Sequence, residues 1–178
     1  IFESNDTPEL FQCALVSETW KVLAENVLMK RWKGKMFDAC KSGETKVVQL
    51  LLERFNYEES GLNIKDEDGW TPFMEACRNG HRDVVQLLLD HSDPNIDLNA
   101  RAIHGTTAFI AACGKGQKYV VQLLLNCPDK NIELNARKDC NGFTAFIMAC
   151  YNGHKDVVQL LLDHSERIDL NARHNNGW

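Results

Sequence analysis

The sequence predicts an all-α protein built as a linear stack of helix pairs, and two observations carry this expectation. First, the string Val-Val-Gln-Leu-Leu-Leu occurs four times, beginning at Val47, Val84, Val120 and Val157, at spacings of 37, 36 and 37 residues. Second, a short apolar segment and a glycine precede each copy, and a polar loop follows it. A fixed period of this length is typical of supersecondary units that stack side by side.

Each repeat contains the same elements in the same order. One unit opens with Gly69-Trp70-Thr71-Pro72, where Thr71 suits a helix N-cap and Pro72 the first helical position. A short apolar helix should follow and end near Gly80, because glycine readily takes the left-handed conformation that closes a helix. A longer helix then contains the repeated Val and Leu residues, and a polar loop completes the unit. The closing glycines of the four units are Gly43, Gly80, Gly116 and Gly153.

The repeats divide most of the chain, and we expect their limits at about residues 34–68, 69–104, 105–141 and 142–176. Gly177-Trp178 then opens a further repeat, so we expect the array to continue beyond Trp178. Residues 1–33 lie outside the repeat pattern and are expected to form an N-terminal helical segment. The chain begins at Ile1 without a methionine, and we therefore interpret it as a fragment of a longer protein.

The repeated residues resemble those of ankyrin repeats over about residues 35–178. They are Gly69-Trp70-Thr71-Pro72-Phe73, Ala76-Cys77, Asn79-Gly80-His81, Val84-Val85, Leu87-Leu88-Leu89 and Leu98-Asn99-Ala100. The resemblance implies a right-handed solenoid of about four helix pairs, with projecting loops and a concave surface that binds other proteins. The period exceeds the family's usual length of about 33 residues because the loop after the second helix is longer. The family's Thr-Pro-Leu-His tetrapeptide also becomes apolar, so we expect apolar contacts in place of a histidine network between repeats.

The resemblance places partner contacts on the loop tips and on the exposed side of the first helix of each pair. The residues that differ between repeats there are Glu67, Asp68, Trp70, Arg78, Ile103, His104, Thr106, Lys115, Asn141, Phe143, Tyr151 and Asn152. Trp70, Phe143 and Tyr151 are the strongest candidates, because aromatic residues dominate interface hot spots. The alternative is that these aromatic side chains pack between adjacent loops.

One first-helix position differs in charge and size between repeats. It holds Glu75, Ala111 and Met148 in successive units. We therefore expect Glu75 and Met148 to contact the partner as well, in a groove that grades from acidic to apolar. Such a groove would accept basic and aliphatic side chains.

Composition and charge argue against two classes of partner. The chain has 25 Asp and Glu residues against 20 Lys and Arg residues, a formal net charge of -5. Nucleic-acid binding depends on a concentrated positive surface, and no basic run occurs, so we expect no nucleic-acid partner. A membrane helix needs about 18 uninterrupted apolar residues, which no segment of the sequence supplies, so we expect no membrane association.

The cysteines are interpreted as structural. Cys40, Cys77, Cys113 and Cys150 occupy one equivalent first-helix position. Packed helices lie about 8 to 10 Å apart, whereas a disulfide needs Cα atoms within about 7 Å, so we expect small buried core residues at this position. The odd total of 7 cysteines suits a reducing compartment, which predicts an intracellular protein of the cytoplasm or nucleus.

We find no catalytic or metal-binding constellation in the sequence. His81 and His154 occupy a position that holds Glu44 and Gln117 in the other repeats, which fits surface polarity or a local hydrogen bond better than a ligand set. No histidine pair has the HExxH spacing of zinc proteases, and no Ser or Cys nucleophile can be assigned a base. We therefore expect a protein that is not an enzyme and needs no cofactor or metal.

The N-terminal segment carries its own apolar pattern. Leu10, Cys13, Val16, Trp20 and Leu23 recur at helical spacing and form one face. With Ile1-Phe2 before them and Trp32 after them, they resemble the later part of an F-box. This resemblance implies a Skp-type adaptor bound through Ile1, Phe2, Leu10, Val16, Trp20 and Leu23. The alternative is a helical cap that shields the apolar face of the first repeat.

Three functions follow from these patterns. The first is a non-catalytic protein-protein interaction module that binds a partner through the loop tips and the first helices. The second is a substrate receptor of a Skp-cullin-F-box ubiquitin ligase, in which the repeats recruit the substrate. The third is a purely structural scaffold array.

Overall fold

The computed structural model describes residues 34–54, 61–91, 96–127, 130–173 and 175. Residues 34–42 are helical. The remaining elements are α2 (Thr45–Arg54), α3 (Pro72–Asn79), α4 (Arg82–Asp90), the short 3-10 helix η1 (Ile103–Gly105), α5 (Ala108–Gly114), α6 (Lys118–Leu125), α7 (Ala145–Tyr151) and α8 (Lys155–Leu162).

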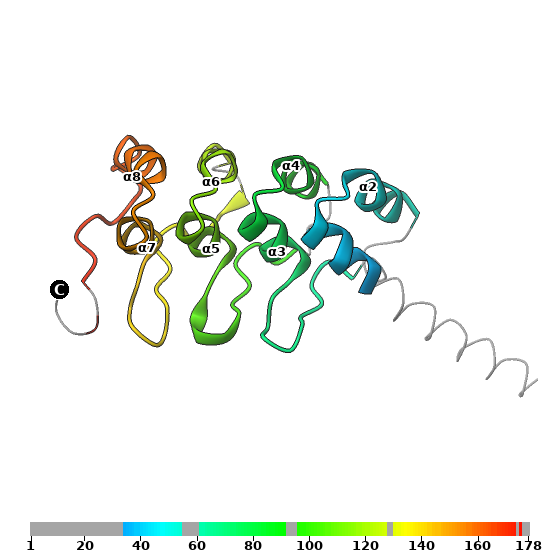
Figure 1. Cartoon of the computed structure of the whole chain (residues 1–178), viewed down its shortest axis with the longest axis horizontal. Coiled ribbons are helices and arrows are strands. Elements are labelled where there is room, and N and C mark those ends of the chain that lie inside the picture. Colours follow the sequence, from blue (N-terminus) through cyan, green and yellow to red (C-terminus); the bar gives the residue numbers. More distant parts are fainter. Residues whose placement is uncertain (1–33, 55–60, 92–95, 128–129, 174, 176–178) are drawn as a thin grey trace, which may run out of the picture.

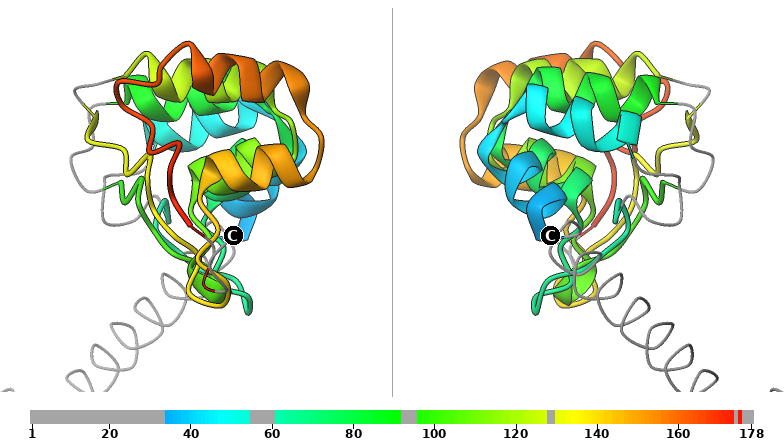
Figure 2. Two further views of the ribbon diagram at one scale, coloured as in Figure 1. Left: turned by 90° about the vertical axis from the view of Figure 1, so that its left-hand side faces the viewer. Right: turned by 90° about the vertical axis from the view of Figure 1, so that its right-hand side faces the viewer.

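The helices form two parallel rows (Figure 1). One row contains the first helices of successive pairs, α3, α5 and α7, and the other contains the second helices, α2, α4, α6 and α8. The end views in Figure 2 show the two rows as two layers, with the loops that precede the first helices projecting from one side. Each helix packs against its counterparts in the adjacent pairs and against the other helix of its own pair. The predicted all-α stack of helix pairs is confirmed.

The first helices begin and end as the local sequence predicts. The hydroxyl oxygen of Thr71 accepts a hydrogen bond from the Met74 amide at 3.3 Å and caps α3. Thr107 and Thr144 cap α5 and α7 in the same way. All four closing glycines have positive φ angles, between 71° and 79°. A β-carbon makes this conformation costly, so glycine is the residue that fits these turns.

The apolar core runs continuously through the stack. Leu88, Leu124 and Leu161 occupy one equivalent position of the second helices, and each is at most 1% exposed. Phe73 and Phe109 of the first helices are also buried in the same cluster. The prediction that the repeated leucines form the core is therefore confirmed.

One predicted core residue is exposed. Cys40, Cys77 and Cys113 are buried as expected, but Cys150 at the equivalent position of α7 is exposed. In the first three repeats the following helix pair covers this position, whereas no described helix pair follows α8. The prediction for Cys150 is wrong because it considered the residue alone and not the neighbouring repeat that must cover it.

We predict that Leu124→Ala lowers the free energy of unfolding by about 2 to 5 kcal/mol, because it leaves a cavity where α6 packs between α4 and α8. Leu50→Ala is the matched control, since this leucine of α2 is 64% exposed. The control should change the free energy by no more than about 0.5 kcal/mol. Urea denaturation followed by circular dichroism measures both values. Equal effects of the two substitutions would contradict a core shared between repeats.

Candidate partner-binding surface

Polar side chains at the ends of the first helices form hydrogen bonds to the preceding repeat. Nε2 of His81 donates to the Lys41 carbonyl oxygen at 2.9 Å. Gln117 makes the equivalent bond to the Arg78 carbonyl oxygen at 3.0 Å. At the altered tetrapeptide we expected apolar contacts between repeats, and these hydrogen bonds lie at a different position. For the position of His81 and His154 the sequence favoured surface polarity or a local hydrogen bond, and the structure shows hydrogen bonds that reach the preceding repeat.

The last described repeat is hydrogen-bonded to the preceding repeat in the same way. Nε2 of His154 donates to the Gly114 carbonyl oxygen at 2.9 Å. The Asn152 amide donates to the same oxygen at 3.0 Å. Asn152 was predicted to contact a partner, and in the structure it uses a side-chain donor to join α5 and α7. Its side chain still lies at the surface.

The loops are also joined from repeat to repeat. Oδ1 of Asn99 accepts a hydrogen bond from the Glu133 amide at 2.8 Å, and Asn135 accepts one from the Asp169 amide at 2.8 Å. These asparagines belong to the repeated Leu-Asn-Ala motif. The motif therefore sets the spacing of neighbouring repeats as well as the local turn.

Backbone hydrogen bonds connect the tips of the projecting loops. The Ile103 amide donates to the Asp68 carbonyl oxygen and the Asp139 amide to the His104 carbonyl oxygen, both at 2.9 Å. The predicted contact residues Glu67, Asp68, Ile103 and His104 keep exposed side chains on these loops. Asn141 is half-buried and accepts the Asn175 amide through its carbonyl oxygen at 3.0 Å. The exposed side chains at the loop tips therefore project from loops whose backbones are hydrogen-bonded to one another.

Predicted contact residues from three repeats converge in one hollow of about 320 Å³. It lies on the first-helix face, by which we mean the surface of α3, α5, α7 and the loops before them. The hollow is lined by Trp70, Arg78, Thr106, Ile110, Ala111, Gly114, Lys115, Lys138, Met148 and Asn152. Trp70, Arg78, Thr106, Lys115, Met148 and Asn152 were predicted as contact residues; Ile110, Gly114 and Lys138 were not.

The hollow exists because the middle repeat has small side chains where its neighbours have large ones. Ala111 stands where the other repeats have Glu75 and Met148. Gly114 similarly stands where they have Arg78 and Tyr151. Sequence reasoning searched for prominent side chains and so missed Gly114. A comparison of side-chain volume at each repeat position would have found it.

Trp70, which lines the hollow, forms a cation–π contact with Arg78. The Arg78 guanidinium carbon lies 4.8 Å from the centroid of the Trp70 ring. The same guanidinium lies 3.3 Å from the Glu75 carboxylate. Trp70 is half-buried and packs against the core, so its ring is oriented by its own repeat while one part stays open to solvent.

Glu75, which was predicted to contact a partner, is buried in the structure. Its side chain is 3% exposed. Its carboxylate accepts hydrogen bonds from Arg78 at 3.3 Å and from Asn79 at 3.0 Å. A buried carboxylate needs such partners, and here the residues one helical turn further along α3 supply them. The expectation of an acidic groove that accepts basic side chains is therefore wrong.

The rim of the hollow is basic instead. Lys115 is exposed at the end of α5, and Lys138 is half-buried in the loop before α7. Among the described residues, no carboxylate lies within 4.0 Å of either ammonium group, whereas Arg78 is paired with Glu75. The hollow thus combines two unpaired positive charges with apolar side chains.

The two remaining aromatic candidates lie together in the last repeat. The rings of Phe143 and Tyr151 have centroids 5.7 Å apart and an interplanar angle of 57°. Tyr151 is 77% exposed, and Phe143 is half-buried. The pair joins the loop before α7 to the end of α7, and neither ring lines the hollow. The six residues predicted to bind an adaptor lie outside the described part of the chain.

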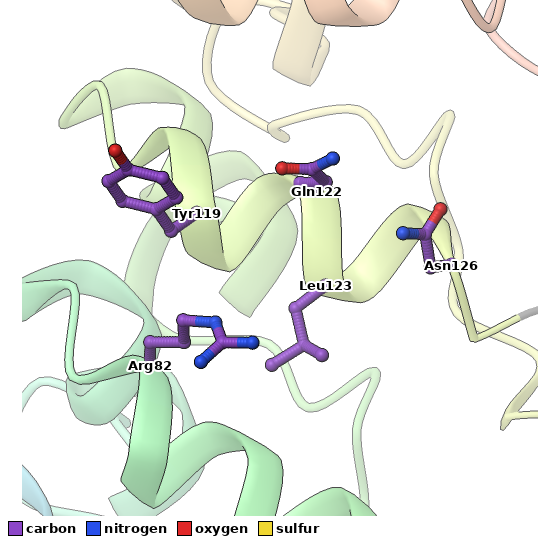
Figure 3. A pocket seen from close by; sticks show the side chains of 5 residues that line it. All are labelled: Arg82, Tyr119, Gln122, Leu123 and Asn126. Carbon is purple, nitrogen blue, oxygen red and sulfur yellow. The ribbon is translucent and has the colours of Figure 1, made fainter.

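A second groove lies on the layer of second helices, between α4 and α6 (Figure 3). It has a volume of about 540 Å³ and is lined by Arg82, Tyr119, Gln122, Leu123 and Asn126. Tyr119 is 69% exposed, and Arg82 lies 3.7 Å from Asp83. Sequence reasoning did not predict this groove, because it assigned binding to the first helices alone.

The buried thiols do not have the properties of catalytic nucleophiles. Burial raises the pKa of Cys40 to about 12 and raises the pKa of Cys113 above its usual range. The pKa of Cys77 is raised by burial and, secondarily, by the nearby Cys40. A thiol of such high pKa is protonated near neutral pH and is a poor nucleophile or metal ligand. Within the described ranges, no group of three or more His, Cys, Asp or Glu residues is placed to hold a metal ion.

The family comparison agrees with this architecture. A family model described as ankyrin repeats (3 copies) matches residues 25–102 and 95–174. The chain therefore belongs to the ankyrin-repeat family, whose repeats are general protein-protein interaction modules. No curated protein matches the chain in a sequence comparison. The helices in the described part of the chain are too short or too polar to cross a membrane.

Proposed function

We propose that this chain is a non-catalytic binding module that holds a protein partner on its first-helix face. The convergence of predicted contact residues from three repeats in one hollow carries this proposal. Trp70, Lys115 and Met148 come from three successive repeats, yet they border the same space. A surface assembled in this way can recognise a partner that no single repeat could bind.

The hydrogen bonds between repeats on the first-helix face support the same function. Hydrogen bonds tie the first helices through His81, Gln117 and His154, and the loop tips through their backbones. Association costs less free energy when the binding surface is already ordered. The buried core residues hold the scaffold, and the residues that differ between repeats are left to set specificity.

The chemistry of the cysteines supports a binding role in a reducing compartment. Cys40, Cys77 and Cys113 are free thiols within the core. Free buried cysteines are typical of proteins of the cytoplasm or nucleus, where disulfides are rare. An intracellular location, in either compartment, is therefore part of the proposal.

Selection of peptide binders tests the proposed surface. Randomised peptides of about twelve residues are displayed and selected on the wild-type chain, since an extended residue spans about 3.3 Å and such a peptide can cross three first helices. Each recovered peptide is then measured against Trp70→Ala/Met148→Ala. We expect affinities to fall by at least about tenfold, because both side chains line the hollow.

The matched control for this selection is Leu50→Ala/Tyr119→Ala. It removes one exposed aliphatic and one exposed aromatic side chain from the second helices. The control should leave the affinities unchanged, and the melting temperature of each variant confirms folding. Recovery of peptides that respond to the control variant alone would assign binding to the second-helix layer. Recovery of no peptide would favour the structural scaffold.

The F-box-like spacing from Leu10 to Leu23 favours a second candidate, a substrate receptor of a Skp-cullin-F-box ubiquitin ligase. This function adds an adaptor site in residues 1–33 to the same binding face. Co-purification from the full natural chain tests it directly. A Skp-type adaptor should accompany the wild-type protein and be lost from a Trp20→Ala/Leu23→Ala variant. Absence of the adaptor from both preparations would contradict this candidate. It would not affect the proposal of a partner-binding first-helix face.

A further inference from the structure

We infer that the occupant of the hollow is an acidic peptide segment that carries one apolar side chain. The inference rests on the proposed function and names the chemistry of its partner. Three features support it: the unpaired charges of the hollow, its floor, and the acidic residues on the loop before α3.

The first feature is the balance of charge. Glu75 neutralises Arg78 at 3.3 Å, so this cation contributes little net charge to the hollow. Lys115 and Lys138 have no carboxylate partner among the described residues. Two unpaired ammonium groups on the rim of one hollow favour a ligand that brings carboxylates.

The second feature is the apolar floor. Ala111 is 7% exposed and Gly114 has no side chain, so α5 presents a depression between the larger residues of α3 and α7. Met148 forms one side of this depression, and the Trp70 ring forms the other. An apolar side chain of the partner can enter here and leave water, which adds affinity that charge alone does not provide.

The third feature limits the size of the acidic segment. Glu67 and Asp68 are exposed on the loop before α3, the same loop that carries Trp70 of the hollow. They repel a polyanion that extends over that loop, and the chain as a whole has a net charge of -5. A nucleic acid, which presents phosphates along its full length, therefore fits this surface poorly. A peptide can place carboxylates against Lys115 and Lys138 only.

The composition of the selected peptides tests this inference. Peptides whose binding falls on Trp70→Ala/Met148→Ala should be enriched in Asp and Glu around a single large apolar residue. Neutral or basic peptides that depend on the same two residues would overturn the inference while leaving the proposed function intact. A selection that yields no peptide dependent on Trp70 and Met148, whatever its charge, would contradict the proposed function itself.

Charge reversal provides the second arm of the test. A recovered acidic peptide is synthesised and titrated by calorimetry against Lys115→Glu/Lys138→Glu, where we expect affinity to fall at least about tenfold. The matched control is Lys46→Glu/Lys155→Glu, which makes the same change of charge at exposed positions of the second helices. Equal loss in both variants would show that overall charge, and not the hollow, attracts the peptide, and would overturn the inference.

Filling the hollow provides the third arm. A β-carbon at Gly114 would lie 3.1 Å from Cε of Met148, so in Gly114→Leu the Met148 side chain must shift and the two side chains together fill the hollow. Unchanged circular dichroism confirms the fold. We expect this variant and replacement of the peptide's apolar residue by alanine to weaken binding to a similar extent. The two changes together should add little to either one, because they remove the same contact. Additive losses would contradict entry of that side chain into the hollow.

Discussion

Each helix pair of this protein depends on the pair beside it to cover its apolar residues. The helices are only seven to ten residues long, and two of them cannot enclose a core. The last repeat shows the consequence. Leu125 of α6 is 1% exposed, whereas Leu162 at the same position of α8 is 41% exposed. The first helices of successive repeats form one face because this dependence holds neighbouring repeats together.

Those features of the fold that arise within one repeat could be predicted from the sequence. Thr71 caps its helix, and the equivalent leucines are buried, because these outcomes follow from local chemistry that recurs at every period. Features that depend on two repeats were harder to predict. The exposure of Cys150 depends on what covers it, and the ties made by His81 and Gln117 join different residue types to distant carbonyl groups.

Comparison of the repeats selected several of the residues that line the hollow, but it did not predict the charge of the hollow. Trp70 and Lys115, predicted as contact residues because they vary between repeats, both border the hollow. The variation between repeats could not show that the Glu75 side chain is buried and paired with Arg78. This pairing removes the acidic charge that we expected in the groove. Nor could the variation show that Gly114 contributes by lacking a side chain, since a pattern of residue types gives no measure of the space between them.

The interaction between repeats can be measured with two matched glycines. Gly116 and Gly153 both have φ of 71°, so alanine at either adds similar backbone strain, about 1 to 2 kcal/mol. At Gly116 the new β-carbon would also lie 2.6 Å from Nδ1 of His154, whereas at Gly153 it meets nothing within 4 Å. Displacing the His154 ring breaks its bond to Gly114, so urea denaturation should show Gly116→Ala to be more destabilising by about 1 kcal/mol. Equal losses for the two variants would contradict the claim that neighbouring repeats hold one another in place.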